Sequence, residues 1–82
     1  MVIVKNGKTE IKVDNSELIE IAHTHDGIVF NFKGGSHYYV TDTRMPVNVK
    51  EMIKISYNRL AESKAKIVID VQNYKAPIQI EA

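Results

Sequence analysis

The chain has 82 residues, which is enough for one domain with one modest hydrophobic core. Cysteine is absent, so disulfide bonds, thiolate metal sites and cysteine nucleophiles are excluded, and the composition fits a reducing compartment. The 11 basic and 10 acidic residues give a net charge of +1, which is far from the strongly basic balance of a dedicated nucleic-acid-binding protein.

No apolar run approaches the roughly 20 residues of a membrane-spanning helix. The first apolar residues are followed at once by Lys5 and Asn6, so they are too few for the apolar region of a signal peptide. A soluble, cytoplasmic protein is expected. Because a chain of this size buries little surface by itself, self-association is the natural source of further buried area.

Three dipeptides separate alternating apolar runs in the first half of the chain: Asn6-Gly7, Asp26-Gly27 and Gly34-Gly35. Each is typical of a two-residue hairpin loop, because such loops need positive φ angles. The first dipeptide predicts an N-terminal hairpin. Five side chains then share its apolar face, namely Val2, Val4, Thr9, Ile11 and Val13.

The second and third dipeptides predict a meander of three strands. With two-residue loops, Phe30 would pair with His23 on one side and with Tyr39 on the other. The face predicted to cover the core then holds Ile21, His23, His25, Ile28, Phe30, Phe32, His37 and Tyr39. The opposite face would hold Leu18, Glu20, Ala22, Thr24, Val29, Asn31, Lys33, Tyr38 and Val40.

A helix is predicted from about residue 49 to about residue 64. Asn48 followed by Glu51 matches a capping box with Asn48 as the N-cap, and Val47 with Met52 fits the flanking hydrophobic staple. An apolar stripe follows the helical period and consists of Val49, Met52, Ile53, Ser56, Leu60 and Ser63, with Tyr57 at its border and Ile55 well outside it.

Two strands are predicted after the helix. Residues 67–71 form a β-branched run without helical period, which is typical of a buried strand. Residues 72–76 form a loop. Pro77 cannot donate a hydrogen bond to a sheet, so Ile78 and Ile80 are predicted to lie in a short edge strand or in an interface.

Together these elements predict a single α+β domain over residues 1–82. Its sheet is small and mostly antiparallel, a hairpin and meander of about seven short strands. One amphipathic helix packs on one face of that sheet, the face that carries Phe30 and Phe32. The predicted order is β-β-β-β-β-α-β-β.

The histidines do not predict a metal site. A strand would direct His23 and His25 to one face, as in many metal sites. His37 is predicted on the same face, but standard strand spacings place it roughly 11–12 Å from His23. Zinc–nitrogen bonds of about 2.1 Å cannot span that separation. The histidines are therefore interpreted as structural or surface residues, and no metal or cofactor is expected.

The sequence also lacks a convincing catalytic constellation. Ser36 and His37 are adjacent, so strand alternation would point them to opposite faces and prevent a nucleophile–base pair. The glycines before Ser36 are followed by a strand, whereas a phosphate-binding loop needs a following helix. No carboxylate pair has an evident apolar pocket. The protein is predicted not to be an enzyme, and no small-molecule substrate is evident.

Two hypotheses for function follow. The first is a non-catalytic interaction or accessory module that acts as a homo-oligomer, a dimer or higher, through Tyr38, Ile55, Ile78 and Ile80. The alternative is sequence-tolerant binding of single-stranded nucleic acid through Lys33, Tyr38, Lys50 and Lys54. In the alternative, Tyr38 would stack on a base and the lysines would contact phosphates.

Residues 27–53 combine an apolar strand, the turn Lys33-Gly34-Gly35-Ser36, the strand with Tyr38-Tyr39, then Met45-Pro46 and an amphipathic helix. This order resembles the KTSC domain, a small family of largely unassigned role found in bacterial and phage proteins. The helix end, Ser56-Tyr57-Asn58-Arg59, does not reproduce the Gly- and Phe-Asn-bearing segment of that family. The resemblance therefore transfers no functional residue and implies only an accessory protein of phage or bacterial origin.

Overall fold

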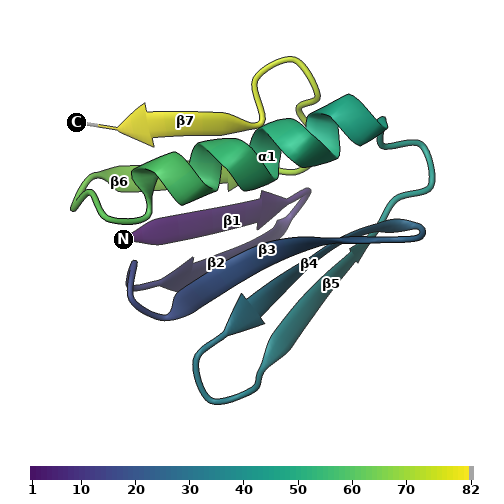
Figure 1. Ribbon diagram of the computed structural model, residues 1–82. Coiled ribbons are helices and arrows are strands. Elements are labelled where there is room, and N and C mark those ends of the chain that lie inside the picture. Colours follow the sequence, from purple (N-terminus) through teal and green to yellow (C-terminus); the bar gives the residue numbers. More distant parts are fainter. Residues whose placement is uncertain (82) are drawn as a thin grey trace.

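The structure is a computed structural model that describes residues 1–81. Over these residues, strands and one helix follow each other in the order expected from the sequence (Figure 1). The elements are β1 (Val2–Asn6), β2 (Thr9–Val13), β3 (Leu18–Thr24), β4 (Gly27–Phe32), β5 (His37–Thr41), α1 (Val47–Leu60), β6 (Lys66–Asp70) and β7 (Ile78–Glu81). The predicted α+β class and the order of elements are confirmed. Within the same residues, no helix is long and apolar enough to cross a membrane.

The strands form two sheets, where the sequence had suggested one. The first sheet has the order β2-β1-β6-β7, and the second has the order β3-β4-β5. All neighbouring strands are antiparallel except β1 and β6, which pair in parallel. A parallel pair needs a long crossover connection. Here the connection from β1 to β6 includes the second sheet and α1. Both of them pack on the same core as β1 and β6.

One hydrophobic core joins both sheets and the helix. β1 and β6 supply Val2, Val4, Ile67 and Ile69 to this core, all without exposed surface. The second sheet adds Leu18, Ile21, Ile28, Phe30 and Val40, and α1 adds Val49, Ile53 and Tyr57. α1 contacts β3 along one flank and β7 along the other.

The predicted faces of the N-terminal hairpin are confirmed. Val2 pairs with Val13 and Val4 pairs with Ile11. The loop is formed by residues 7–8, one position later than the predicted Asn6-Gly7, and Gly7 adopts a φ of 63°. Each cross-strand pair moves by two residues as a result. Because side chains alternate with a period of two, the apolar face keeps its members.

The β3–β4 hairpin shows a similar displacement and a bulge. Its loop is formed by residues 25–26, so His23 pairs with Ile28. The register shifts between Leu18 and Glu20, where β3 contains an additional residue. That bulge turns Leu18 into the core and leaves Ile19 exposed by 62%. The prediction that Leu18 lies on the outer face was therefore wrong.

The predicted faces of β5 are reversed in the structure. Tyr38 pairs with Phe30, so Tyr38 faces the core, whereas His37 and Tyr39 face away from it. The cause is the length of the loop, in which the Phe32 N–H donates to the Ser36 carbonyl at 2.8 Å and residues 33–35 make the turn. A loop with one more residue than expected moves every side chain of the following strand to the other face.

α1 begins and ends earlier than predicted, at Val47 and Leu60. Pro46 occupies the N-cap position, and no side chain caps the helix. The predicted capping by Asn48 was therefore wrong, because the fixed φ of Pro46 starts the helix before Asn48 is reached. The buried side of the helix is also rotated from the predicted stripe, and consists of Val49, Lys50, Ile53 and Tyr57.

Candidate functional site

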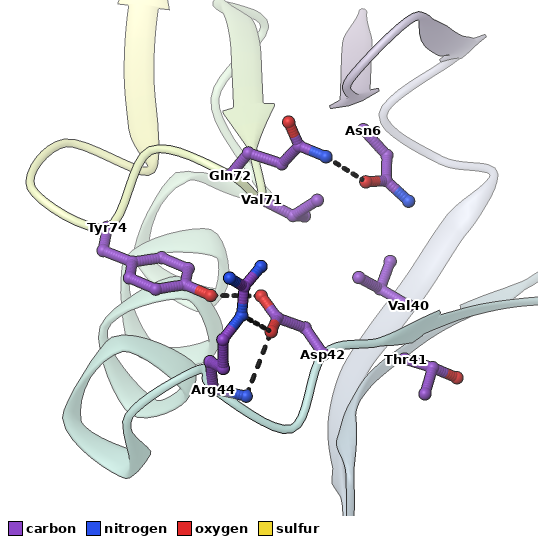
Figure 2. Close-up of a pocket in the computed structure, with 8 residues that line it drawn as sticks. All are labelled: Asn6, Val40, Thr41, Asp42, Arg44, Val71, Gln72 and Tyr74. Carbon is purple, nitrogen blue, oxygen red and sulfur yellow. Dashed lines mark hydrogen bonds and ion pairs between the residues drawn. The ribbon is translucent and has the colours of Figure 1, made fainter.

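A polar pocket of about 450 Å³ lies where the ends of β1, β5 and β6 meet (Figure 2). Its size falls within the range of small-molecule sites, which are typically about 300–1,000 Å³. The β6–β7 loop and the connector before α1 complete its walls. The lining residues are Asn6, Val40, Thr41, Asp42, Arg44, Val71, Gln72 and Tyr74.

The parallel pairing of β1 with β6 creates this pocket. Lys5 is paired with Asp70, so both strands end at the same edge of the sheet. The Val71 N–H then donates to the Lys5 carbonyl at 3.1 Å and extends the pairing by one step. Beyond this point Asn6 and Gln72 are brought together, although they are 66 positions apart in the sequence.

Asp42 is the centre of the hydrogen bonding in the pocket. Its carboxylate accepts hydrogen bonds from the Tyr74 hydroxyl and, at 3.1 Å, from the Arg44 N–H. The Arg44 Nε atom lies 3.8 Å from Asp42 Oδ1. The hydrogen bond from Tyr74 is the main cause of a lowered pKa of Asp42, and the same bond raises the pKa of the Tyr74 phenol. Asp42 is therefore ionised and Tyr74 neutral at pH 7.

The Arg44 guanidinium faces the side-chain amides of Asn6 and Gln72 across the pocket. The Arg44 guanidinium extends into it from the connector, and its side chain is 89% exposed (Figure 2). On the other side, Gln72 Nε2 donates to Asn6 Oδ1 at 3.2 Å. Asn6 Nδ2 in turn donates to the Tyr38 hydroxyl at 3.0 Å. This chain fixes both amides and leaves Gln72 Oε1 available as an acceptor.

Of the predicted interaction residues, Tyr38 lies in the second sheet, apart from Ile78 and Ile80 in β7. Ile55 and Ile80 are about half exposed, as the interaction hypothesis requires. Ile78 is half-buried and packs against the core. Tyr38 is also half-buried, with its ring centroid 6.2 Å from that of Phe30. The prediction that Tyr38 lies on the face opposite the core was wrong, because β5 has the reversed register described above.

The lysines proposed as nucleic-acid contacts do not share one exposed surface. Lys50 is buried, and its Nζ donates to the Thr24 carbonyl at 3.2 Å. This hydrogen bond fixes α1 against the end of β3. Lys33 and Lys54 are exposed, the first in the β4–β5 loop and the second on α1.

The histidines lie on different surfaces. His23 and His25 are exposed near the β3–β4 loop, while His37 lies on the outer face of β5, contrary to the prediction that it shares a face with His23. Its Nδ1 atom is 2.6 Å from Asn31 Oδ1. Within residues 1–81, no three His, Asp or Glu side chains are grouped so that they could hold a metal ion.

No family model, curated protein or solved structure matches the chain. The resemblance of residues 27–53 to the KTSC domain is therefore not supported by a family match. Two features of the chain are open to a ligand or partner, namely the polar pocket and the exposed Ile80 of β7.

Replacing Tyr74 with phenylalanine is expected to raise the pKa of Asp42 toward its ordinary value of 3.8, because the main cause of its lowering is removed. A carboxyl group with a lowered pKa stabilises the folded state above its unfolded pKa, and this stabilisation is lost as the pH falls through the folded pKa. Tyr74→Phe should therefore cost about 0.5 kcal/mol at pH 7, a modest amount for a pair near solvent, and less at acidic pH.

Carboxyl-detected NMR over an acidic pH series measures this pKa directly, and urea unfolding at two pH values measures the stability. Tyr39→Phe is the matched control, since Tyr39 lies on the exposed face of β5 away from Asp42. If the pKa of Asp42 is the same in wild type and in Tyr74→Phe, the hydrogen bond is not formed in solution.

Proposed function

We propose that the protein is a non-catalytic interaction module that acts as a homodimer, with β7 of one copy paired to β7 of a second copy. The observation that carries the proposal is the position of β7. It is the last strand of the four-stranded sheet and is paired on one side only, with β6. Such an edge is a template for pairing with another chain.

The open edge presents the backbone groups of two isoleucines. The Asp70 N–H donates to the Pro77 carbonyl at 2.7 Å, which identifies a hydrogen-bonded pair of the antiparallel ladder. Because inward and outward backbone groups alternate along a strand, Gln79 is directed toward β6. Ile78 and Ile80 therefore direct their N–H and C=O groups to the unpaired side.

The β7 sequence is self-complementary. Ile78 and Ile80 are placed symmetrically about Gln79. An antiparallel second copy, related by a two-fold axis at Gln79, would pair Ile78 with Ile80 in both directions. This arrangement satisfies the open N–H and C=O groups and joins two four-stranded sheets into one continuous sheet. It supports a second copy of the same chain as the partner.

Apolar side chains extend the edge onto the helix. Lys50 and Tyr57 turn toward β3, where they hydrogen-bond to backbone carbonyls. Met52 and Ile55 project from the opposite flank of α1, the flank toward β7, and are 42% and 49% exposed. With Ile78 and Ile80 they form the β7 edge patch, which consists of Met52, Ile55, Ile78 and Ile80.

The centre of the β7 edge also lacks the charges that commonly protect such strands. Protected edges often carry lysine, proline or inward-pointing charges. In β7 the proline precedes the strand and the acidic residue, Glu81, ends it. Glu81 is paired with Lys66 at 3.0 Å, so it contributes little repulsion. The Ile-Gln-Ile segment between them remains open to pairing.

Sedimentation equilibrium over a wide concentration range tests the proposal. The wild type is expected to form a dimer with a dissociation constant of about 1–100 μM, as is usual for a small interface. Ile80→Lys and Ile55→Glu should each weaken it at least tenfold. Ile19→Glu is the matched control, since Ile19 is an equally exposed isoleucine on the β3 bulge. A wild type that stays monomeric up to about 1 mM contradicts the proposal, as does equal weakening by the control.

The nucleic-acid alternative has less support. Lys50 is bonded to β3 instead of facing solvent, and Tyr39 replaces Tyr38 as the exposed tyrosine of β5. Adding a mixed-sequence oligonucleotide to the same sedimentation experiment separates the two functions. A monomer that gains mass only with the oligonucleotide, and loses it steeply as salt is raised, would favour this alternative.

A further inference from the structure

We propose that the pocket beside Asp42 and Arg44 binds a free α-amino acid as a zwitterion. The ligand carboxylate would lie on the Arg44 guanidinium. Its ammonium group would lie on the Asp42 carboxylate. This site is distinct from the β7 edge patch, and its binding does not depend on dimer formation.

The charges of the pocket select this class of ligand. The Arg44 Nε and Asp42 Oδ1 atoms are 3.8 Å apart, so one positive and one negative group stand side by side with no net charge. A simple anion would be attracted by Arg44 and repelled by Asp42 at similar distances, and the two energies would nearly cancel. An α-amino acid carries both charges on one carbon atom. It can place each of them against its opposite at the same time.

The Arg44 guanidinium is open to a ligand carboxylate, since its side chain is 89% exposed. Figure 2 shows the Arg44 guanidinium in the middle of the pocket, with its terminal nitrogens beyond Asp42. A guanidinium in this position can hold a carboxylate through two parallel hydrogen bonds. Gln72 Nε2 is occupied by Asn6 Oδ1, and Figure 2 shows Gln72 Oε1 turned away from Asp42, so the ammonium group is met by the Asp42 carboxylate alone.

Tyr74 acts as a positioning residue for the acidic end. Its hydroxyl donates to Asp42 Oδ2, while the Arg44 N–H donates to Oδ1. Both bonds hold the Asp42 carboxylate in one orientation, directly after the end of β5. An ammonium group is then met by an acceptor that is already ordered, which lowers the entropic cost of binding.

Val40 and Val71 line the back wall of the pocket, but they are only 4% and 1% exposed, so a ligand side chain would cover little further apolar surface there. Recognition is therefore expected to depend on the two charged groups and to discriminate weakly between amino acids with different side chains.

Chemical-shift titration of the ¹⁵N-labelled protein tests the site. L-Leucine and L-valine are expected to give saturable shifts at the amides of residues 41–44 and 71–74, with dissociation constants below about 10 mM. Isovalerate, which has the carboxylate without the amine, and isobutylamine, which has the amine without the carboxylate, should bind at least tenfold more weakly.

Arg44→Gln should weaken leucine binding by about tenfold to a hundredfold, the loss expected for a charged hydrogen bond. Arg59→Gln removes the same charge from an exposed position on α1 and is the matched control. Amide spectra of both variants report whether they are folded. The proposal is overturned if no amino acid gives saturable shifts up to about 10 mM, if isovalerate binds as well as leucine, or if both arginine variants weaken binding equally.

Discussion

Replacing Gly27 with alanine is expected to lower the free energy of unfolding by about 3 kcal/mol. Gly27 begins β4 and pairs with Thr41 of β5. A Cβ atom at this position would lie 1.8 Å from the Val40 carbonyl oxygen and 3.1 Å from the Asp42 nitrogen. Both atoms belong to the backbone, so no side-chain rotation can relieve the contact. The end of β5 would have to move.

That movement would also disturb the pocket, because the Asp42 N–H donates to the Asp26 carbonyl at 2.7 Å, directly before Gly27. Urea unfolding followed by circular dichroism measures the loss of stability. Gly34→Ala is a suitable comparison, since a Cβ atom at Gly34 meets no atom within 4 Å. Its φ of 91° still makes alanine costly, by about 1–2 kcal/mol. Equal losses for both variants would show that the close approach at Gly27 is absent in solution.

The hairpin loops show how much of the fold the turn-forming dipeptides could predict. Turn-forming residues and alternating apolar positions located the three hairpins formed by β1 to β5. They did not determine how many residues each loop contains. At Gly7 and Asp26 the loop lay one position away from the predicted one, which changed each cross-strand partner by two residues. The side chains of the first hairpin, and of β3 and β4 next to their loop, therefore stayed on the predicted faces. At Gly34 the loop gained one residue, so the faces of β5 were reversed.

The errors at Leu18 and Asn48 have a related origin. Leu18 reaches the core only through a bulge, and bulges have no reliable pattern in a single sequence. Asn48 matches a capping box, but Pro46 stands two positions earlier and starts the helix first. In both cases a local pattern was present and tertiary packing or a neighbouring residue overrode it. The class of each element could be predicted, whereas its boundary and register could not.

The pocket could not be predicted for a different reason. Its polar residues come from three segments, and the hydrogen bonds that join them span 32 and 66 positions in the sequence. They meet because β1 and β6 pair in parallel, a long-range contact with no short sequence signal. The exposed positions of Ile55 and Ile80 were easier to anticipate. One lies outside the helical stripe and the other follows a proline in an edge strand.

Shortening Tyr57 to alanine should have the largest effect on stability, a loss of about 4 kcal/mol. Tyr57 is almost fully buried in the core between α1 and the second sheet. Its hydroxyl donates to the Leu18 carbonyl at 2.6 Å, at the position where the β3 bulge begins. The expected stability of a chain of this length is about 4–12 kcal/mol, so Tyr57→Ala would remove between about a third and all of it.

Tyr57→Phe separates the two parts of that loss. It keeps the ring in the core and leaves a buried carbonyl without its donor, which should cost about 1–3 kcal/mol in urea unfolding.

Burial also raises the pKa of the Tyr57 phenol above its ordinary value of 10.0. The tyrosine therefore stabilises the fold below the unfolded pKa, and this stabilisation is lost as the pH rises through the folded pKa. Tyr57→Phe should therefore lose less stability than wild type as the pH rises above 10.0, because phenylalanine has no phenol to ionise. Equal alkaline sensitivity in both proteins would mean that the hydroxyl is not buried. In that case α1 would not be fixed to the β3 bulge, and the flank that carries Met52 and Ile55 would not be held beside β7.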